Sequence, residues 1–159
     1  MAAVATVGVY GWTVERFLEA LRANDVQLVL DVRRRRGVRG SEYTWANSGR
    51  LQASLAAAGI GYEHRKVLAP TTELRQLQYR EDDRLGEGKR SRSELAAEYR
   101  ERYTREILDR VDLASIMEDL RDAVSALLCV ERDPEACHRS LIAARLAEGH
   151  GVSVVHLRP

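Results

Sequence analysis

Residues Thr6–Val32 read TVGVYGWTVERFLEALRANDVQLVLDV, and this segment holds the strongest evidence for the fold class. Thr6–Tyr10 is an apolar run closed by a glycine, which is typical of a buried strand. Val14–Ala23 repeats apolar residues at helical spacing behind Thr13, a favourable N-cap. Val26–Val32 is a second apolar strand. A strand, a helix and a strand within about 30 residues form a βαβ unit, which requires a parallel strand pair.

The remaining apolar segments alternate between the two periods in the same way. Further strands are expected at Ile60–His64, Ala126–Val130 and Val152–Leu157. Further helices are expected at Gly49–Ala58, Glu73–Tyr79, Glu94–Leu108, Leu113–Val124 and Ala136–Glu148. This alternation predicts a single α/β domain over residues 1–159, a three-layer sandwich around a mainly parallel five-stranded sheet. We expect a Rossmann-like arrangement with the strand order 3-2-1-4-5 and a ligand site where the first and fourth strands end.

Composition excludes several classes of protein. With 45% hydrophobic and 31% charged residues, the chain is too apolar for a disordered protein. Its apolar runs are too short to cross a bilayer. Met1–Val9 lacks the basic start and the cleavage site of a signal peptide, so we expect it to begin the sheet. The 2 cysteines argue against a disulfide scaffold, and a reducing cytoplasm is the expected location.

The net charge of +1 conceals a basic segment. Residues 31–70 contain eight Lys or Arg and three Asp or Glu, a net of +5. Most of the excess lies in one run, which comprises Arg33, Arg34, Arg35, Arg36 and Arg39. Arginine stays protonated and offers a bidentate fork, so this run suits phosphate; a solvated loop that binds nothing is the alternative. Glu81–Ser93, the polar stretch, is interpreted as a surface linker.

The most informative chemistry lies in LLCVERDPEACHRSLIA, Leu127–Ala143. Cys129 ends a strand and is interpreted as a core residue. Cys137-His138-Arg139 opens a helix, whose N-terminus attracts anions and lowers the pKa of a nearby thiol. We therefore expect a partly ionised thiol at Cys137, proton transfer by His138 and an oxyanion clamp at Arg139.

Several sharper assignments fail on spacing. A Cys-x5-Arg phosphatase loop needs arginine at 135 or 143, where Glu135 and Ala143 stand. Seven residues separate Cys129 from Cys137, so there is no CxxC redox motif. A structural zinc site needs four ligands, and Cys137 and His138 are adjacent in sequence, which makes them a poor chelating pair. No metal site is expected.

Other candidate residues stand at strand ends. Asp31 closes the second strand beside Arg33, where it is either a site residue or half of a structural ion pair. Gly11 and Trp12 follow the first strand, where an aromatic ring can stack on a base or cover the sheet edge. His64 ends the third strand, and a core or edge position is the alternative to ligand binding.

These blocks together resemble the bacterial family called domain of unknown function 488, over Thr6–Leu157. The most specific match is the C-terminal block, with Cys129, Glu131, Pro134, Cys137, His138 and Arg139. Earlier matches are Asp31, Val32, Arg33, Arg39 and Tyr43, then Gly59, Ile60, Tyr62 and His64. Arg36, Val38 and Ala69-Pro70 depart from the pattern of the family in two loops. The resemblance implies a fold and a shared site, and it implies no reaction.

The leading hypothesis is a protein that binds a phosphorylated ligand, a nucleotide or nucleic acid, and hydrolyses or transfers it. The catalytic candidates are Asp31, Glu131, Cys137 and His138. The ligand-binding candidates are Gly11, Trp12, Arg33, Arg39, Tyr43, His64 and Arg139. One alternative is a non-catalytic nucleic-acid-binding module that uses the Arg33–Arg39 run with Tyr43 and Trp45. Another is a thiol-dependent redox enzyme centred on Cys137. The sequence identifies no cofactor and no membrane partner.

Overall fold

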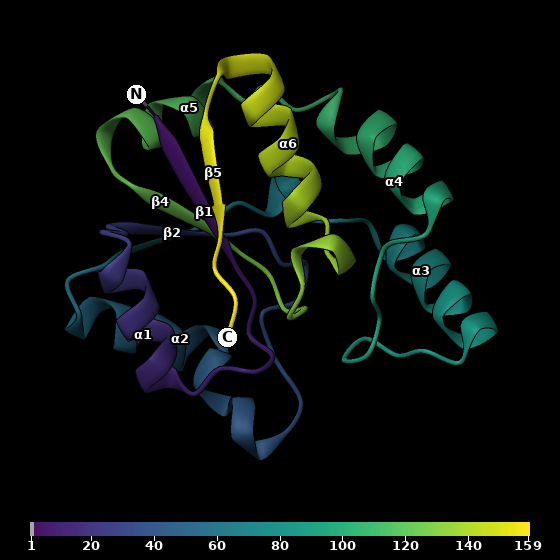
Figure 1. Ribbon diagram of the computed structural model, residues 1–159, viewed down its shortest axis with the longest axis horizontal. Helices are drawn as coiled ribbons and strands as arrows, with labels where there is room; N and C mark the ends of the chain where they lie inside the picture. Colours follow the sequence, from purple (N-terminus) through teal and green to yellow (C-terminus); the bar gives the residue numbers. More distant parts are fainter. Residues whose placement is uncertain (1) are drawn as a thin grey trace.

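A five-stranded parallel sheet forms the centre of the computed structural model, which describes residues 2–159 (Figure 1). The strand order is β3-β2-β4-β1-β5, and every neighbouring pair is parallel. The strands are β1 (Ala3–Val7), β2 (Leu28–Asp31), β3 (Gly61–His64), β4 (Ser125–Leu128) and β5 (Ser153–His156). β4 is buried along its whole length, whereas the edge strands β3 and β5 alternate between exposed and half-buried residues.

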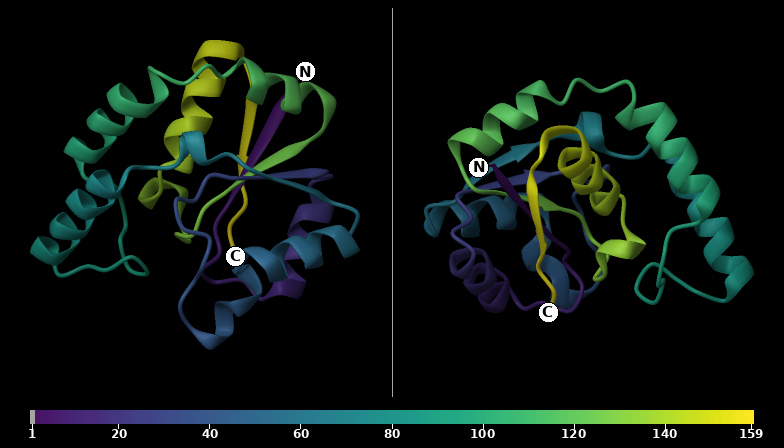
Figure 2. Two further views of the ribbon diagram at one scale, coloured as in Figure 1. Left: turned by 180° about the vertical axis from the view of Figure 1, so that it is seen from behind. Right: turned by 45° about the horizontal axis from the view of Figure 1, so that its top comes forward.

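Helices cover both faces of the sheet. α1 (Val14–Ala23) and α2 (Ser48–Ala57) lie on one face, and α5 (Ala114–Asp122) and α6 (Arg139–His150) lie on the other (Figure 1). α6 packs on β1 and β5. α3 (Thr72–Leu85) and α4 (Ala97–Tyr103) pack on each other at one flank, which Figure 2 shows from two further sides. The α/β class, the three layers and the five-stranded parallel sheet are therefore confirmed.

Short helical turns join these elements. Three 3-10 turns span Ser41–Ala46, Lys66–Leu68 and Pro134–Ala136, and a π-helical turn, Thr104–Leu108, continues α4. Among residues 2–159, no helix combines the length and the apolar character that crossing a membrane requires.

The first βαβ unit forms for the reasons that its sequence indicates. The Thr13 hydroxyl accepts a hydrogen bond from the amide of Arg16 at 3.3 Å and caps α1, whose bounds agree with the prediction. Phe17 and Leu21 on α1 are fully buried against the sheet. Asp25 reverses the chain with a φ of 55°, and β2 follows.

The expected strand order, 3-2-1-4-5, is wrong at its centre because β4 lies between β2 and β1. β1 and β2 are not neighbours in the sheet. One strand lies between them, and that strand is β4. The expected juxtaposition of the first and fourth strands is nonetheless present, and α1 and α6 leave these two strands toward opposite faces (Figure 1). Leu128 at the end of β4 is in register with Val7 on one side and with Asp31 on the other. The loops that follow β1, β2 and β4 therefore start at one edge of the sheet.

Several expected boundaries are also wrong. α6 begins at Arg139 and not at Ala136, so Cys137 precedes the helix that it was expected to open. The first strand was expected at Thr6–Tyr10, but β1 ends at Val7, because the chain bends so that the amides of Val9 and Tyr10 both donate to the carbonyl of Val130. The polar stretch Glu81–Ser93 is not a plain linker. α3 extends to Leu85, and Arg92, at the end of the stretch, is only 6% exposed.

Candidate functional site

Two adjacent cavities, which share part of their lining, lie at the carboxyl edge of the sheet. We call the deeper one, of ≈ 40 Å³, the inner pocket and the larger one, of ≈ 950 Å³, the outer cleft. Residues that line both are Arg35, Arg75, Tyr79, Lys89 and Val130. The inner pocket has room for a few water-sized atoms. The outer cleft has the size of a small-molecule site.

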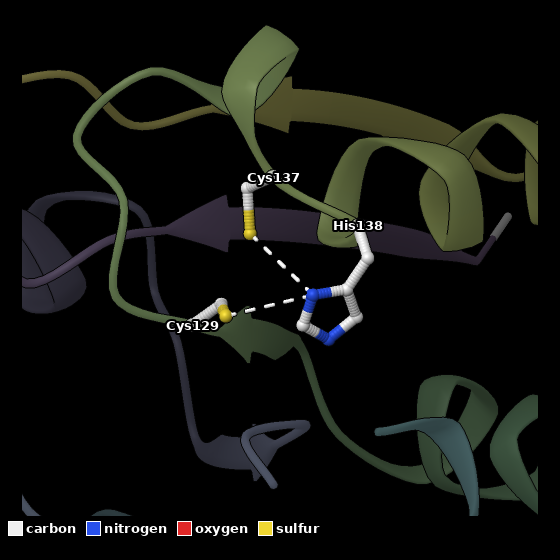
Figure 3. Close-up of side chains that lie close together, drawn as sticks. All are labelled: Cys129, Cys137 and His138. Carbon is white, nitrogen blue, oxygen red and sulfur yellow. Dashed lines mark hydrogen bonds between the residues drawn. The ribbon is translucent and has the colours of Figure 1, made fainter. Parts of the chain in front are cut away.

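Cys129, Cys137 and His138 meet at the base of the inner pocket (Figure 3). Cys129 directly follows β4, and Cys137 and His138 lie between the Pro134–Ala136 turn and α6. The Nδ1 atom of His138 is 3.7 Å from the sulfur of Cys129 and 3.8 Å from that of Cys137. All three potential ligand atoms lie within 4.8 Å of one another. The loop after β4 thus brings the thiols at its two ends together around one imidazole.

The His138 ring is held in one orientation. Its Nε2 atom lies 2.8 Å from the backbone oxygen of Val32, just after β2. A carbonyl oxygen only accepts, so Nε2 carries the proton and Nδ1 faces the two sulfurs. The Tyr103 ring packs on His138 at 5.5 Å between ring centres, and the Tyr103 hydroxyl donates to the carbonyl of Leu68. Hydrogen bonding and packing therefore both fix the imidazole.

The two thiols differ in their ionisation. Burial raises the pKa of the Cys137 thiol, but a hydrogen bond from Cys129 and the positive charges of Arg139 and His138 lower this pKa well below its usual value. Burial and the neighbouring Cys137 together raise the pKa of Cys129. For His138, burial lowers the pKa, but the charge of Cys137 outweighs this effect and raises it. The directions of these shifts favour the ionised thiol at Cys137 and the neutral thiol at Cys129.

Glu131 lies beside this cluster and is held by an arginine from a distant segment. Its Oε2 atom accepts from the Cys129 thiol at 3.4 Å, and its Oε1 atom accepts from Arg92 at 3.3 Å. Arg92 also forms a two-pronged pair with Asp82 at the end of α3 and donates to the carbonyl of Ala136. Arg92 therefore ties the segment after α3 to the loop after β4.

Asp31 and Arg33, both expected in the site, form a buried ion pair beneath it. Arg33 donates to both carboxylate oxygens of Asp31 at 2.9 and 2.8 Å and to the carbonyl of Ala46. The Tyr62 hydroxyl donates to the same carboxylate at 2.5 Å. His64 Nε2 contacts the carbonyl of Arg33 at 2.9 Å. These bonds hold the start of the loop over residues 33–39, which we call the arginine loop, against the sheet. Arg33 also lines the inner pocket.

Arg139 is fully buried, and two of its guanidinium nitrogens bond within the fold, whereas its Nε atom has no hydrogen-bond partner among residues 2–159. It donates to the carbonyls of Glu131 at 2.7 Å and Arg132 at 3.1 Å, so it holds the loop after β4 against the first turn of α6. It lines neither the inner pocket nor the outer cleft. Arg139 affects the site through its positive charge, which lowers the pKa of the Cys137 thiol.

Gly11, Trp12 and Tyr43 form a separate group that lines neither cavity. The amide of Gly11 donates to the Tyr43 hydroxyl at 3.0 Å, and Trp12 is 9% exposed. The Tyr43 ring packs on Tyr10, a residue of the outer cleft. This group therefore supports one wall of the cleft from behind.

The outer cleft is cationic. Its basic lining residues are Arg35, Arg39, Arg75 and Lys89, and none of the described residues that line it is acidic. The side chains of Arg35 and Arg39 make no ion pair or hydrogen bond with any residue in the range 2–159. Burial lowers the pKa of Lys89, but the charge of Glu131 raises it above its usual value, so Lys89 is a cation. The cleft is thus suited to an anion.

The structure adds site residues that the sequence does not single out. Lys89 and Arg92 come from the stretch interpreted as a linker, and Arg75 and Tyr79 come from α3. No periodic pattern marks Lys89 or Arg92, and Arg92 bonds to Glu131 and Ala136, which lie far away in the sequence. Cys129, interpreted as a core residue, is both buried and part of the pocket.

Comparison with known proteins gives one match. The family model described as Domain of unknown function DUF488 covers residues 13–146, which is more than half of the chain and includes the whole Cys129–His138 segment. No curated protein and no solved structure matches the chain. The description of this family names no activity.

Proposed function

The chain belongs to the DUF488 family, and we propose that it binds a phosphorylated ligand of the nucleotide class in the outer cleft and hydrolyses or transfers a group at the inner pocket. The observation that supports this proposal is the cationic lining of the cleft by Arg35, Arg39, Arg75 and Lys89. Arginine forks and a lysine ammonium are the side chains that recognise phosphate most often.

The different sizes of the two cavities support different roles, with ligand binding in the outer cleft and reaction at the inner pocket. The outer cleft of ≈ 950 Å³ is large enough for a nucleotide, whereas the inner pocket of ≈ 40 Å³ admits only the reacting atoms. Glu131, Cys137 and His138 line the inner pocket, and they supply the acid–base and nucleophilic groups that hydrolysis or transfer requires. Asp31 and Arg33 act in this proposal as positioning residues, since their polar atoms bond to each other and to the backbone.

A binding experiment tests the ligand class. Isothermal titration of nucleoside mono-, di- and triphosphates, with inorganic phosphate and an unphosphorylated nucleoside alongside, measures affinity for each. We expect Arg35→Ala, Arg75→Ala and Lys89→Ala each to weaken binding of the best nucleotide by roughly 10–100-fold, which corresponds to about 1.5–3 kcal/mol for a hydrogen bond to a charged group. Arg16→Ala, an exposed α1 residue that lines neither cavity, is the control and should leave the affinity unchanged.

Two outcomes would contradict the proposal. One is an affinity for the unphosphorylated nucleoside equal to that for the nucleotides. The other is a loss of affinity in Arg16→Ala as large as in the cleft variants, because the binding would then reflect general charge and not the cleft.

The arginine loop favours nucleic acid as a second candidate ligand. Arg34, Arg35 and Arg39 are all exposed on the loop after β2. If they bind a polymer backbone, affinity for RNA or DNA falls steeply with salt and exceeds that for any mononucleotide. Binding of mononucleotides alone, with no measurable affinity for oligonucleotides, rejects this candidate.

A further inference from the structure

We propose that Cys129, Cys137 and His138 form a binding site for a divalent metal ion of the zinc class at the base of the inner pocket. Two thiolates and one imidazole are a donor set that zinc prefers, and all three side chains are almost fully buried. This inference goes beyond the proposed phosphate-binding function, and anion binding in the outer cleft does not depend on it. With an ion bound, Cys137 and His138 would be its ligands, and they would no longer serve as the nucleophile and the proton-transfer group at the inner pocket. It also departs from the expectation, based on spacing, that the chain has no metal site.

Interatomic distances support a tetrahedral ion. With Zn–S bonds of about 2.3 Å and Zn–N bonds of about 2.0–2.1 Å, tetrahedral geometry separates sulfur and nitrogen by about 3.6 Å. His138 Nδ1 lies 3.7 Å from the sulfur of Cys129 and 3.8 Å from that of Cys137. Both separations fit one central ion with only small adjustments. The two sulfurs are also within 4.8 Å of each other.

The hydrogen bond on the far side of the His138 ring is typical of a metal ligand. A histidine that ligates through one nitrogen usually donates its other N–H to a carbonyl or carboxylate, which fixes the ring. His138 does this through Nε2 and the carbonyl of Val32 at 2.8 Å, so the lone pair of Nδ1 is directed at the sulfurs (Figure 3). Tyr103 packs on the ring as well. The imidazole is thereby arranged before any ion binds.

Backbone geometry explains how adjacent residues can share one ion. Cys137 has an extended conformation, with φ −139° and ψ 144°, at the end of the Pro134–Ala136 turn. His138 is already helical, with φ −62° and ψ −19°, at the start of α6. This change of conformation between neighbours allows both side chains to meet Cys129 (Figure 3). A regular strand or helix would direct two adjacent side chains apart.

The ligand count identifies the type of site. Three protein ligands leave the fourth tetrahedral position open, as in catalytic zinc sites, whereas structural sites have four. The three ligands line the inner pocket, whose ≈ 40 Å³ can hold a water molecule at that position. Glu131 lines the same pocket and could take a proton from such a water.

Metal titration tests the site. The purified protein, residues 1–159, is reduced, freed of metal and titrated with Co²⁺, which reports tetrahedral thiolate ligation through its visible and near-ultraviolet spectrum. Zn²⁺ is then added to displace it. We expect one Co²⁺ per chain with a thiolate charge-transfer band, lost in Cys129→Ser, Cys137→Ser and His138→Gln. His150→Gln, exposed at the end of α6, is the matched control and should keep the band.

The result that overturns the proposal is a reduced wild-type protein that binds no Co²⁺ or Zn²⁺, or a Cys137→Ser variant with the wild-type spectrum. Circular dichroism shows whether each variant is folded. X-ray absorption of the zinc-loaded wild type covers the case of unfolded variants: two sulfurs at about 2.3 Å and one nitrogen at about 2.0–2.1 Å are expected, and fewer than two sulfurs contradict the assignment. Arg35→Ala should bind Co²⁺ normally, which separates failure of this site from failure of the phosphate cleft.

Discussion

A single glycine allows the two loops around the site to touch. Gly8 directly follows β1, and a Cβ atom built on it would lie 1.9 Å from the backbone oxygen of Glu131. Arg139 donates to the same oxygen at 2.7 Å, so this carbonyl cannot move freely. The position of the Glu131 loop, and with it the inner pocket, therefore depends on the absence of a side chain at residue 8.

We expect Gly8→Ala to lower the free energy of unfolding by about 1–3 kcal/mol, the usual cost of forcing an extra methyl group into a packed site. Urea unfolding measures the change. Gly149→Ala is the control, because a Cβ at this α6 position meets nothing within 4 Å and alanine favours a helix. Equal stabilities of Gly8→Ala and the wild type would show that the two loops are not in the contact described.

Some of the candidate site residues bond to other parts of the fold and do not line the cavities. Asp31 and Arg39 are both sequence candidates, yet Asp31 is bonded to Arg33 and Tyr62 under the loop, whereas Arg39 lines the cleft. Sequence alone could not separate these roles, because a polar residue at a strand end can pair internally or face a ligand. The difference comes from partners such as Ala46 and Tyr62, which the fold brings from other segments.

At the level of elements, the segment between α3 and α4 is held over the inner pocket by Arg92. Its guanidinium bonds to Asp82, Glu131 and the carbonyl of Ala136. Asp82 lies on α3, whereas Glu131 and Ala136 lie between β4 and α6. Burial lowers the pKa of Arg92, but its hydrogen bonds to Asp82 and the nearby acidic charges raise it, so the group remains charged.

Arg92→Ala should destabilise the protein by about 3–5 kcal/mol, because it leaves the buried Asp82 carboxylate without its cationic partner and with only the Gln78 amide as a side-chain donor. Chemical denaturation gives the magnitude. Arg84→Ala removes an exposed α3 arginine paired with Glu81 and should change stability far less. If the two variants are equally stable, Arg92 does not anchor the segment.

Elements with strong local signals were predictable and those fixed by distant contacts were not. α1 has a capping threonine and a clear apolar face, and its predicted bounds agree with the structure. The Glu81–Ser93 stretch has neither, and the partner of Arg92 at Glu131 is 39 residues away. Composition therefore indicated a linker where the structure has a wall of the pocket.

At the scale of the whole molecule, strand order determines which residues share a site. With β4 between β2 and β1, Cys129 comes next to the end of β2, and His138 bonds to Val32 there. In the expected order, β1 would have separated these groups. The sequence did carry a relevant signal, since Ala126–Val130 has no polar residue and such a run suits a strand buried on both faces.

A crystal structure with the nucleotide that binds most tightly in the titration examines the whole arrangement at once. We expect its phosphate oxygens within about 2.7–3.2 Å of donors on Arg35, Arg75 or Lys89, and the reacting end of the ligand toward Cys137 and His138. A nucleotide ordered elsewhere on the surface, or an empty cleft at saturating concentration, would contradict the account.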